Sequence, residues 1–156
     1  MNQQCNSCLY LKNPDGNILV SDYWVVALAP NQGYLGRCYV TLKQHKGDLS
    51  SLSDKEWLDF ADTSRRMEKA LKSAFNATPF NWSCLMNNAY QHEPPQPHVH
   101  WHLLPRYEKS VKLNGLEFTD PQFGHHYDRD QRRSVDDATY RVIAQKVKTK
   151  LTQSTK

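Results

Sequence analysis

The stretch from His98 to Leu104 constrains the fold most, because three histidines alternate there with apolar residues. Alternation is typical of a β-strand, in which successive side chains point to opposite faces of a sheet. The histidines would share one face, about 6.5–7 Å apart at a rise of about 3.3 Å per residue. Val99, Trp101 and Leu103 would pack on the other face. Neutral imidazoles need hydrogen-bond partners or a metal, so the histidine face predicts metal binding, acid–base chemistry or nucleophilic chemistry.

The remaining elements predict an α+β fold. The most distinct is a helix from Asp54 to Phe75, where Ser53-Asp54-Lys55-Glu56 matches the capping-box pattern and apolar residues recur at three- and four-residue intervals. The other expected elements are a strand over 18–28 with a bend at Ser21-Asp22, strands over 36–42 and 80–88, a short extended segment over 111–118, and a helix over 135–151. This order indicates an antiparallel sheet combined with helices.

Length and composition limit the class of protein. A chain of 156 residues is expected to form one domain over residues 1–156. The net charge of +4 favours anionic ligands, but the basic residues are scattered, so we expect no nucleic-acid partner. The longest apolar run covers only residues 23–29, and residues 1–5 show no secretory pattern. We therefore expect no membrane association and a cytoplasmic location.

Cys5 and Cys8 form a Cys-x-x-Cys pair with the spacing of metal ligands. A tetrahedral zinc ion needs two further ligands, and spacing alone does not select them. The candidates are His45, His92, His98, His100, His102, His125 and His126. Two thiols without a metal are the alternative, and a redox role is disfavoured because no βαβ pattern follows. Cys38 and Cys84 stand in apolar surroundings, so we expect both to be buried.

A histidine of the alternating row could act as a nucleophile or a general base, because imidazole is largely unprotonated at neutral pH. Its other ring nitrogen would need an acceptor, either a backbone carbonyl or another histidine. Asn87, Gln91 and Gln96 are neutral donors that could hold a phosphate. Each could equally be a loop residue that bonds to nearby backbone.

The seven residues His98-Val99-His100-Trp101-His102-Leu103-Leu104 resemble the His-φ-His-φ-His-φ-φ signature of the histidine triad (HIT) family, where Pro105-Arg106-Tyr107 often follows. Residues 36–45 are similar to the family's Gly-His-x-φ-φ-φ-Pro-Lys-x-His strand. The resemblance implies a five-stranded antiparallel sheet with a long central helix, to which the sequence adds a C-terminal helix. The core match covers 1–107, residues 108–156 form an extension, and a homodimer is the usual assembly.

The resemblance also implies an activity. The chain would be a nucleotide hydrolase that cleaves a phosphoanhydride or phosphoramidate, with dinucleoside polyphosphates as the leading substrate class. His100 would attack the α-phosphorus to give a nucleotidyl-histidine, which water resolves. His102 would contact the phosphate or assist the leaving group, and Asn87 would orient the phosphate or the catalytic imidazole. The alternatives are a nucleotidyltransferase, in which phosphate resolves the intermediate, and a nucleotide-binding regulatory module with little turnover, which retention of His100 disfavours.

In zinc-bearing members of the family, the ligands correspond to Cys5, Cys8, His45 and His98, which implies a structural Zn²⁺ that ties the N-terminus to the histidine strand. The segment over 123–127, with two histidines and two aromatic residues, is expected either to close over the site or to pack at the dimer edge.

Three positions depart from the family pattern. Arg37 stands where a histidine is usual, and we expect its permanent charge to bind phosphate. The acidic residue that holds the ribose would fall near Ala29, so ribose recognition must differ. Glu93-Pro94-Pro95-Gln96 replaces the usual Gly-Gln-Ser/Thr, which leaves Gln96 or His92 to contact the phosphate.

Overall fold

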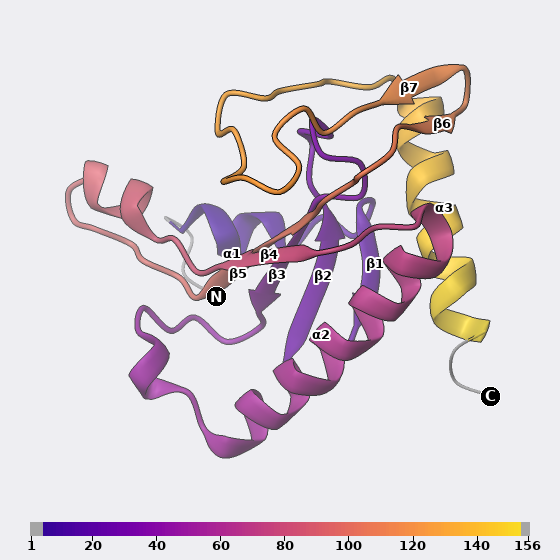
Figure 1. Ribbon diagram of the computed structural model, residues 1–156. Helices are drawn as coiled ribbons and strands as arrows, with labels where there is room; N and C mark the ends of the chain where they lie inside the picture. Colours follow the sequence, from indigo (N-terminus) through magenta and orange to yellow (C-terminus); the bar gives the residue numbers. More distant parts are fainter. Residues whose placement is uncertain (1–4, 154–156) are drawn as a thin grey trace.

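A five-stranded antiparallel sheet forms the centre of the protein (Figure 1). The computed structural model describes residues 5–153; residues 1–4, part of the segment without a secretory pattern, lie outside it. The strands are β1 (Asn17–Val20), β2 (Trp24–Leu28), β3 (Cys38–Leu42), β4 (Phe80–Ser83) and β5 (His100–Pro105). Their order is β1-β2-β3-β5-β4, and every neighbouring pair is antiparallel. The predicted α+β fold with a five-stranded sheet is confirmed.

Helix α2 (Asp54–Phe75) lies across one face of the sheet, and α3 (Asp137–Gln153) packs against α2 and β1. The capping box at the start of α2 is formed in both directions between Ser53 and Glu56. Asn76 ends the helix in the left-handed conformation, with φ of 57°. Local signals therefore define both ends of this helix, and the predicted bounds are confirmed. Within residues 5–153, no helix has the length and hydrophobicity needed to span a membrane.

The apolar side of the histidine strand faces α2, as its alternation predicts. Val99 and Leu103 are fully buried in the core. The Trp101 ring stacks on Phe60 of α2, with ring centroids 4.8 Å apart. The opposite face of β5 is therefore left for the histidines.

The segment over 18–28 is not one bent strand, and this prediction was wrong. It forms β1 and β2, which fold back on each other through a tight turn. The Asp59 carboxylate on α2 accepts hydrogen bonds from the Ser21 hydroxyl and the Tyr23 backbone N–H, both at 2.7 Å. A side chain distant in the sequence thus stabilises the turn, and local propensity carries no sign of it.

Three further segments differ from their predicted form. The strand expected over 80–88 ends at Ser83, and the 3₁₀ helix η2 (Asn87–Gln91) follows it. Residues 111–118 form a hairpin of β6 (Val111–Leu113) and β7 (Leu116–Phe118). Its turn residues Asn114 and Gly115 have φ of 49° and 74°, values that favour Asn-Gly in a two-residue turn. Two short helices complete the structure, α1 (Asn6–Tyr10) and η1 (Leu49–Ser51).

Candidate functional site

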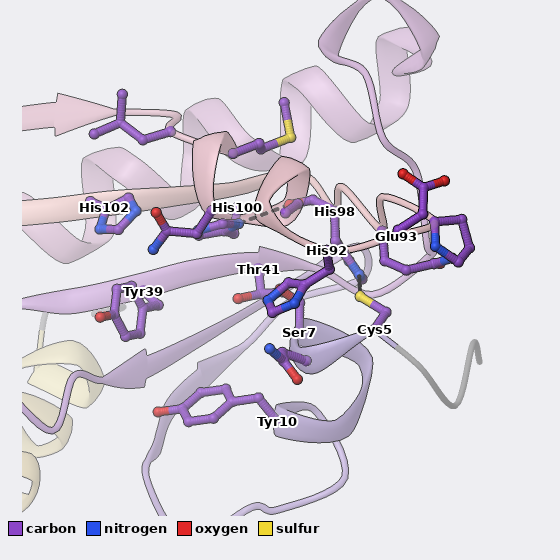
Figure 2. A pocket seen from close by; sticks show the side chains of 17 residues that line it. Cys5, Ser7, Tyr10, Tyr39, Thr41, His92, Glu93, His98, His100 and His102 are labelled. Carbon is purple, nitrogen blue, oxygen red and sulfur yellow. Dashed lines mark hydrogen bonds between the residues drawn. The ribbon is translucent and has the colours of Figure 1, made fainter.

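The three histidines of the row lie on the sheet face opposite α2 and line one cleft of about 550 Å³ (Figure 2). Tyr39 of β3 is directly opposite His102, and Thr41 is opposite His100. Residues of α1 form another part of the lining, and the segment 85–96 after β4 contributes most of the rest. The cleft is therefore enclosed by the sheet, the first helix and the Pro-rich loop.

At one end of the cleft, four side chains converge on a single point: Cys5, Cys8, His45 and His98. The His98 Nδ1 atom lies 3.4 Å from Cys5 Sγ, 3.5 Å from Cys8 Sγ and 3.3 Å from His45 Nδ1. Cys8 Sγ lies 3.5 Å from His45 Nδ1. Sequence spacing could not select the two histidines, and the fold brings these two to the cysteines.

The donor set and its spacing fit tetrahedral zinc. Typical Zn–N and Zn–S bonds place nitrogen ligands about 3.3 Å apart and nitrogen and sulfur ligands about 3.5 Å apart. The separations in the cluster agree with these values. His98 Nε2 donates to the Leu42 carbonyl at 2.7 Å, which leaves Nδ1 as the ligand atom. Burial lowers the pKa of His98, which favours the neutral, metal-binding form. The predicted structural zinc site is present.

The middle histidine has a defined tautomer. His100 Nδ1 lies 2.8 Å from the carbonyl oxygen of His98. A carbonyl oxygen only accepts hydrogen bonds, so Nδ1 carries the proton and Nε2 keeps its lone pair. The residue that holds the metal thus also orients the neighbouring imidazole through its backbone.

The third histidine is neutral at physiological pH. Burial, together with the neighbouring His100 and Arg37, lowers the pKa of His102 to about 4, against an opposing backbone hydrogen bond with Leu85. Its ring packs edge-on against Tyr39, with centroids 5.1 Å apart. His102 can therefore accept or donate a hydrogen bond at neutral pH without adding charge to the site.

Of the other predicted site residues, some line the cleft and others lie beside it or outside it. Gln96 and His92 line the cleft, whereas its lining includes Asn88 rather than Asn87. Asn87 is exposed at the start of η2, because β4 ends earlier than expected. Arg37 lies beside the cleft, with its guanidinium carbon 5.9 Å from the centre of the Tyr39 ring. Its Nε atom is buried and has no hydrogen-bond partner among residues 5–153.

The remaining histidines and cysteines have other surroundings. His125 and His126 line a separate hollow along β4 together with Tyr127 and Arg129. Cys38 is fully buried, as predicted, but Cys84 is only half-buried. The segment over 123–127 therefore borders the β4 edge and does not close over the triad cleft in this conformation.

Sequence reasoning missed the contribution of α1 and β3 to the site. Asn6, Ser7 and Tyr10 line the cleft from α1, and Tyr39 and Thr41 line it from β3. The β3 pair could have been found, because alternation that buries Cys38, Val40 and Leu42 turns Tyr39 and Thr41 to the other face. The α1 residues carry no such signal.

A comparison with protein-family models assigns the chain to a family. The model of the HIT domain matches residues 11–109, well over half of the sequence. The chain belongs to the HIT family. The triad, its strand and the following Arg106 all lie inside the matched range. A search of curated proteins found no match for this HIT protein.

Solved structures share the fold at low sequence identity. A zinc-bound histidine triad family protein from Mycobacterium smegmatis is 18% identical, with a TM-score of 0.66 and 98% of each chain covered. A histidine triad nucleotide-binding protein described as hypothetical, from Sulfolobus tokodaii, is 13% identical, with a TM-score of 0.68 over 96% of this chain and 93% of the other. A uridylyltransferase is 17% identical with a TM-score of 0.66, and the match covers 96% of this chain but 45% of that enzyme.

Proposed function

We propose that this HIT protein is a nucleotide hydrolase that cleaves a phosphoanhydride or phosphoramidate through His100, with dinucleoside polyphosphates as the leading substrate class. The observation that carries the proposal is the hydrogen bond from His100 Nδ1 to the His98 carbonyl. This bond leaves the Nε2 lone pair of a cleft-lining imidazole available for attack on phosphorus. The nucleotide-binding description of the Sulfolobus tokodaii protein supports the same ligand class.

The reaction would have two displacements. In the first, the His100 Nε2 lone pair forms a bond to the α-phosphorus, and the bond from phosphorus to the leaving group breaks with its electron pair on the leaving group. In the second, a water oxygen attacks phosphorus and loses a proton to bulk water, the P–N bond breaks, and its electrons return to Nε2; the departed leaving group takes its proton from bulk water. The products are a nucleoside monophosphate and the leaving group. The His98 carbonyl holds the Nδ1 proton throughout, so the imidazole is ready for the next cycle.

The neighbouring residues would hold the phosphate. Neutral His102 can bond a phosphate oxygen, and Arg37 supplies a permanent positive charge beside it. Gln96 lines the cleft and can donate from its amide, and Asn87 remains a proposed contact that would require its exposed side chain to turn inward. Zinc, when bound by Cys5, Cys8, His45 and His98, supplies structural support and takes no part in the displacements.

The test is turnover by the His100→Ala variant. We expect it to abolish release of nucleoside monophosphate from dinucleoside polyphosphates, adenosine phosphoramidate and nucleoside diphosphate sugars, while nucleotide binding stays measurable. His126→Ala is the matched control, because His126 is exposed and does not line the cleft. Full activity of His100→Ala would overturn the mechanism.

A nucleotidyltransferase is the second candidate function, supported by the structural likeness to a uridylyltransferase. The same assay in the presence of inorganic phosphate distinguishes the two. With adenosine phosphoramidate, whose leaving group carries no nucleotide, a transferase would yield a nucleoside diphosphate from phosphate and the intermediate, whereas a hydrolase would yield the monophosphate. Binding without turnover of any substrate would indicate a regulatory module.

We also propose a homodimer formed along β4. Among the described strands, β4 is one of the two edge strands of the five-stranded sheet and pairs only with β5; β1 is the other edge. Exposed apolar side chains accompany this edge: Leu85 after β4 is 37% exposed, as is Trp57, whose ring contacts Phe60 next to Trp82 of β4. Light scattering should give twice the chain mass, and Leu85→Lys should lower it. A wild-type monomer at micromolar concentration would refute the dimer. The cytoplasmic location remains a prediction.

A further inference from the structure

Helix α1 forms a wall of the triad cleft. Asn6, Ser7 and Tyr10 line the cavity together with His100 and His102. Figure 2 shows Ser7 and Tyr10 on α1, across the cleft from His100. The Tyr10 ring meets Tyr39 edge-on at 6.3 Å, and Tyr39 in turn contacts His102 at 5.1 Å. Any ligand with its phosphorus at His100 would therefore have α1 on its other side.

The metal site holds this wall in place. Helix α1 has five residues, which is far too short to be stable alone. Cys5 directly precedes it and Cys8 lies within it, and these side chains are 1% and 0% exposed in the zinc site. Beyond the metal ligands, Tyr10 anchors α1 through its hydroxyl, which donates to the Leu28 carbonyl at 3.2 Å. Zinc binding and the shape of the cleft are thus linked through one short helix.

The polar groups on this wall suit an uncharged ligand group. The Asn6 amide and the Ser7 hydroxyl each donate and accept, as adjacent sugar hydroxyls also do. The triad imidazoles lie on the sheet side of the cleft, where a phosphate would bind, and His92 reaches the cleft from the loop after η2. Ala29, near the position at which a ribose-binding acid was expected, is fully buried and cannot contact a ligand.

We propose that α1 recognises the sugar hydroxyls of the bound nucleotide through Asn6 and Ser7, and that the metal at Cys5 and Cys8 holds α1 in the recognising position. The inference rests on the proposed function, because it takes the nucleotide phosphate to lie at His100. It adds a second role to the zinc site, which sets substrate affinity as well as stability.

The first test compares sugars at constant zinc content. Wild-type protein is titrated by calorimetry with adenosine, guanosine and uridine 5′-monophosphates, and the tightest is compared with its 2′,3′-dideoxy analogue. We expect the dideoxy form to bind about tenfold more weakly. The double variant Asn6→Ala/Ser7→Ala should bind both forms with the same weak affinity. Leu9→Ala is the matched control on the same helix, because Leu9 is 45% exposed and lies outside the cleft lining, and it should discriminate like wild type.

The second test removes the metal with a chelator and follows hydrogen exchange as well as binding. We expect protection from hydrogen exchange to be lost in residues 6–10 but kept in α3. The dissociation constant of the nucleoside 5′-monophosphate should rise at least tenfold. A metal-free protein that keeps both the fold and the wild-type dissociation constant would overturn the linkage. If metal removal unfolds the whole chain, the role of α1 is tested by the sugar discrimination of the zinc-loaded Asn6→Ala/Ser7→Ala variant against that of Leu9→Ala.

The two proposals fail in different ways. Unchanged sugar discrimination in Asn6→Ala/Ser7→Ala, together with normal turnover through His100, would overturn only the role of α1. The absence of any nucleotide binding or turnover in the zinc-loaded wild type would overturn the proposed function and this inference with it.

Discussion

At the residue scale, one type of side chain has three different environments along one strand face. His98 donates from Nε2 to the Leu42 carbonyl and turns Nδ1 to the metal site. His100 donates from Nδ1 to the His98 carbonyl. His102 is enclosed by Tyr39, His100 and the charge of Arg37. The backbone partner of each ring, more than its position in the row, determines which nitrogen is available.

The depressed pKa of His102 predicts a dependence of stability on pH. Its pKa falls from 6.5 to about 4 on folding, so between these values the unfolded chain binds a proton that the folded chain does not. Stability from this residue is therefore complete above pH 6.5 and is lost as the pH falls toward 4. The loss should be about 2 kcal/mol between pH 7 and pH 5.

Urea unfolding of the wild type and of His102→Gln at both pH values measures this effect. Glutamine does not titrate, so the free energy of unfolding of His102→Gln should not show the loss that His102 causes between pH 7 and pH 5. The zinc ligands contribute equally to the pH dependence of both proteins. Parallel pH dependence in the two proteins would show that His102 keeps an ordinary pKa.

Individual site residues could be predicted where the alternation of polar and apolar residues along a strand alone determines which face of the sheet they occupy. The histidine row and its apolar reverse side follow from the period of a strand. The proposed contact of Asn87 with the phosphate stays a prediction, because the chain leaves β4 after Ser83 and places Asn88 rather than Asn87 in the lining. The surroundings of Arg37 depend on Tyr39 and on packing at the end of β3, which no local pattern reveals.

At the scale of elements, predictability follows the range of the stabilising contacts. Ser53 and Glu56 define the start of α2, and Asn76 defines its end. Each of these residues lies within one turn of the end that it defines, and the sequence predicted both bounds of the helix. The β1–β2 turn depends on Asp59, and residues 119–136, here called the tail loop, depend on Arg106. Contacts of this kind join distant parts of the chain and have no local sequence signal.

Arg106 fastens the tail loop to the triad strand. Its guanidinium donates to Asp120 from Nε at 2.6 Å and from Nη2 at 3.0 Å. It also donates to the carbonyls of Gln122 and His125 and to the Asn81 side chain of β4. Both charged side chains are almost completely buried, at 3% and 0% exposure. A buried pair of this kind is costly to break from one side, because the remaining charge is left without its partner.

Asp120→Asn should therefore lower the free energy of unfolding by about 3 kcal/mol. Asp130→Asn provides the control, because Asp130 is an exposed aspartate in the same loop, and a change within about 0.5 kcal/mol is expected there. Denaturant titration at neutral pH measures both. Equal stability of the two variants would show that the pair contributes little beyond its backbone hydrogen bonds.

At the scale of the whole molecule, the zinc site and the sheet form one connected structure. The ligands come from the start of the chain, from the segment after β3 and from the residue two positions before β5, so the metal joins parts separated by up to 93 residues. The same His98 that closes this link orients His100. The fold thus couples a structural centre to the proposed nucleophile through one residue and its carbonyl group.

This connection predicts that stability depends on the metal. Elemental analysis should find about one zinc per chain, and Cys5→Ser should lose it, since three ligands bind zinc far more weakly than four. Because binding free energy at such a site is folding free energy, the melting temperature should fall by roughly 10 °C or more. Cys84→Ser is the matched control, because Cys84 lies outside the cluster and should retain the metal. Metal-free wild-type protein with an unchanged melting temperature, and with Cys5 and Cys8 open to a thiol reagent, would show that these residues do not form a structural zinc site.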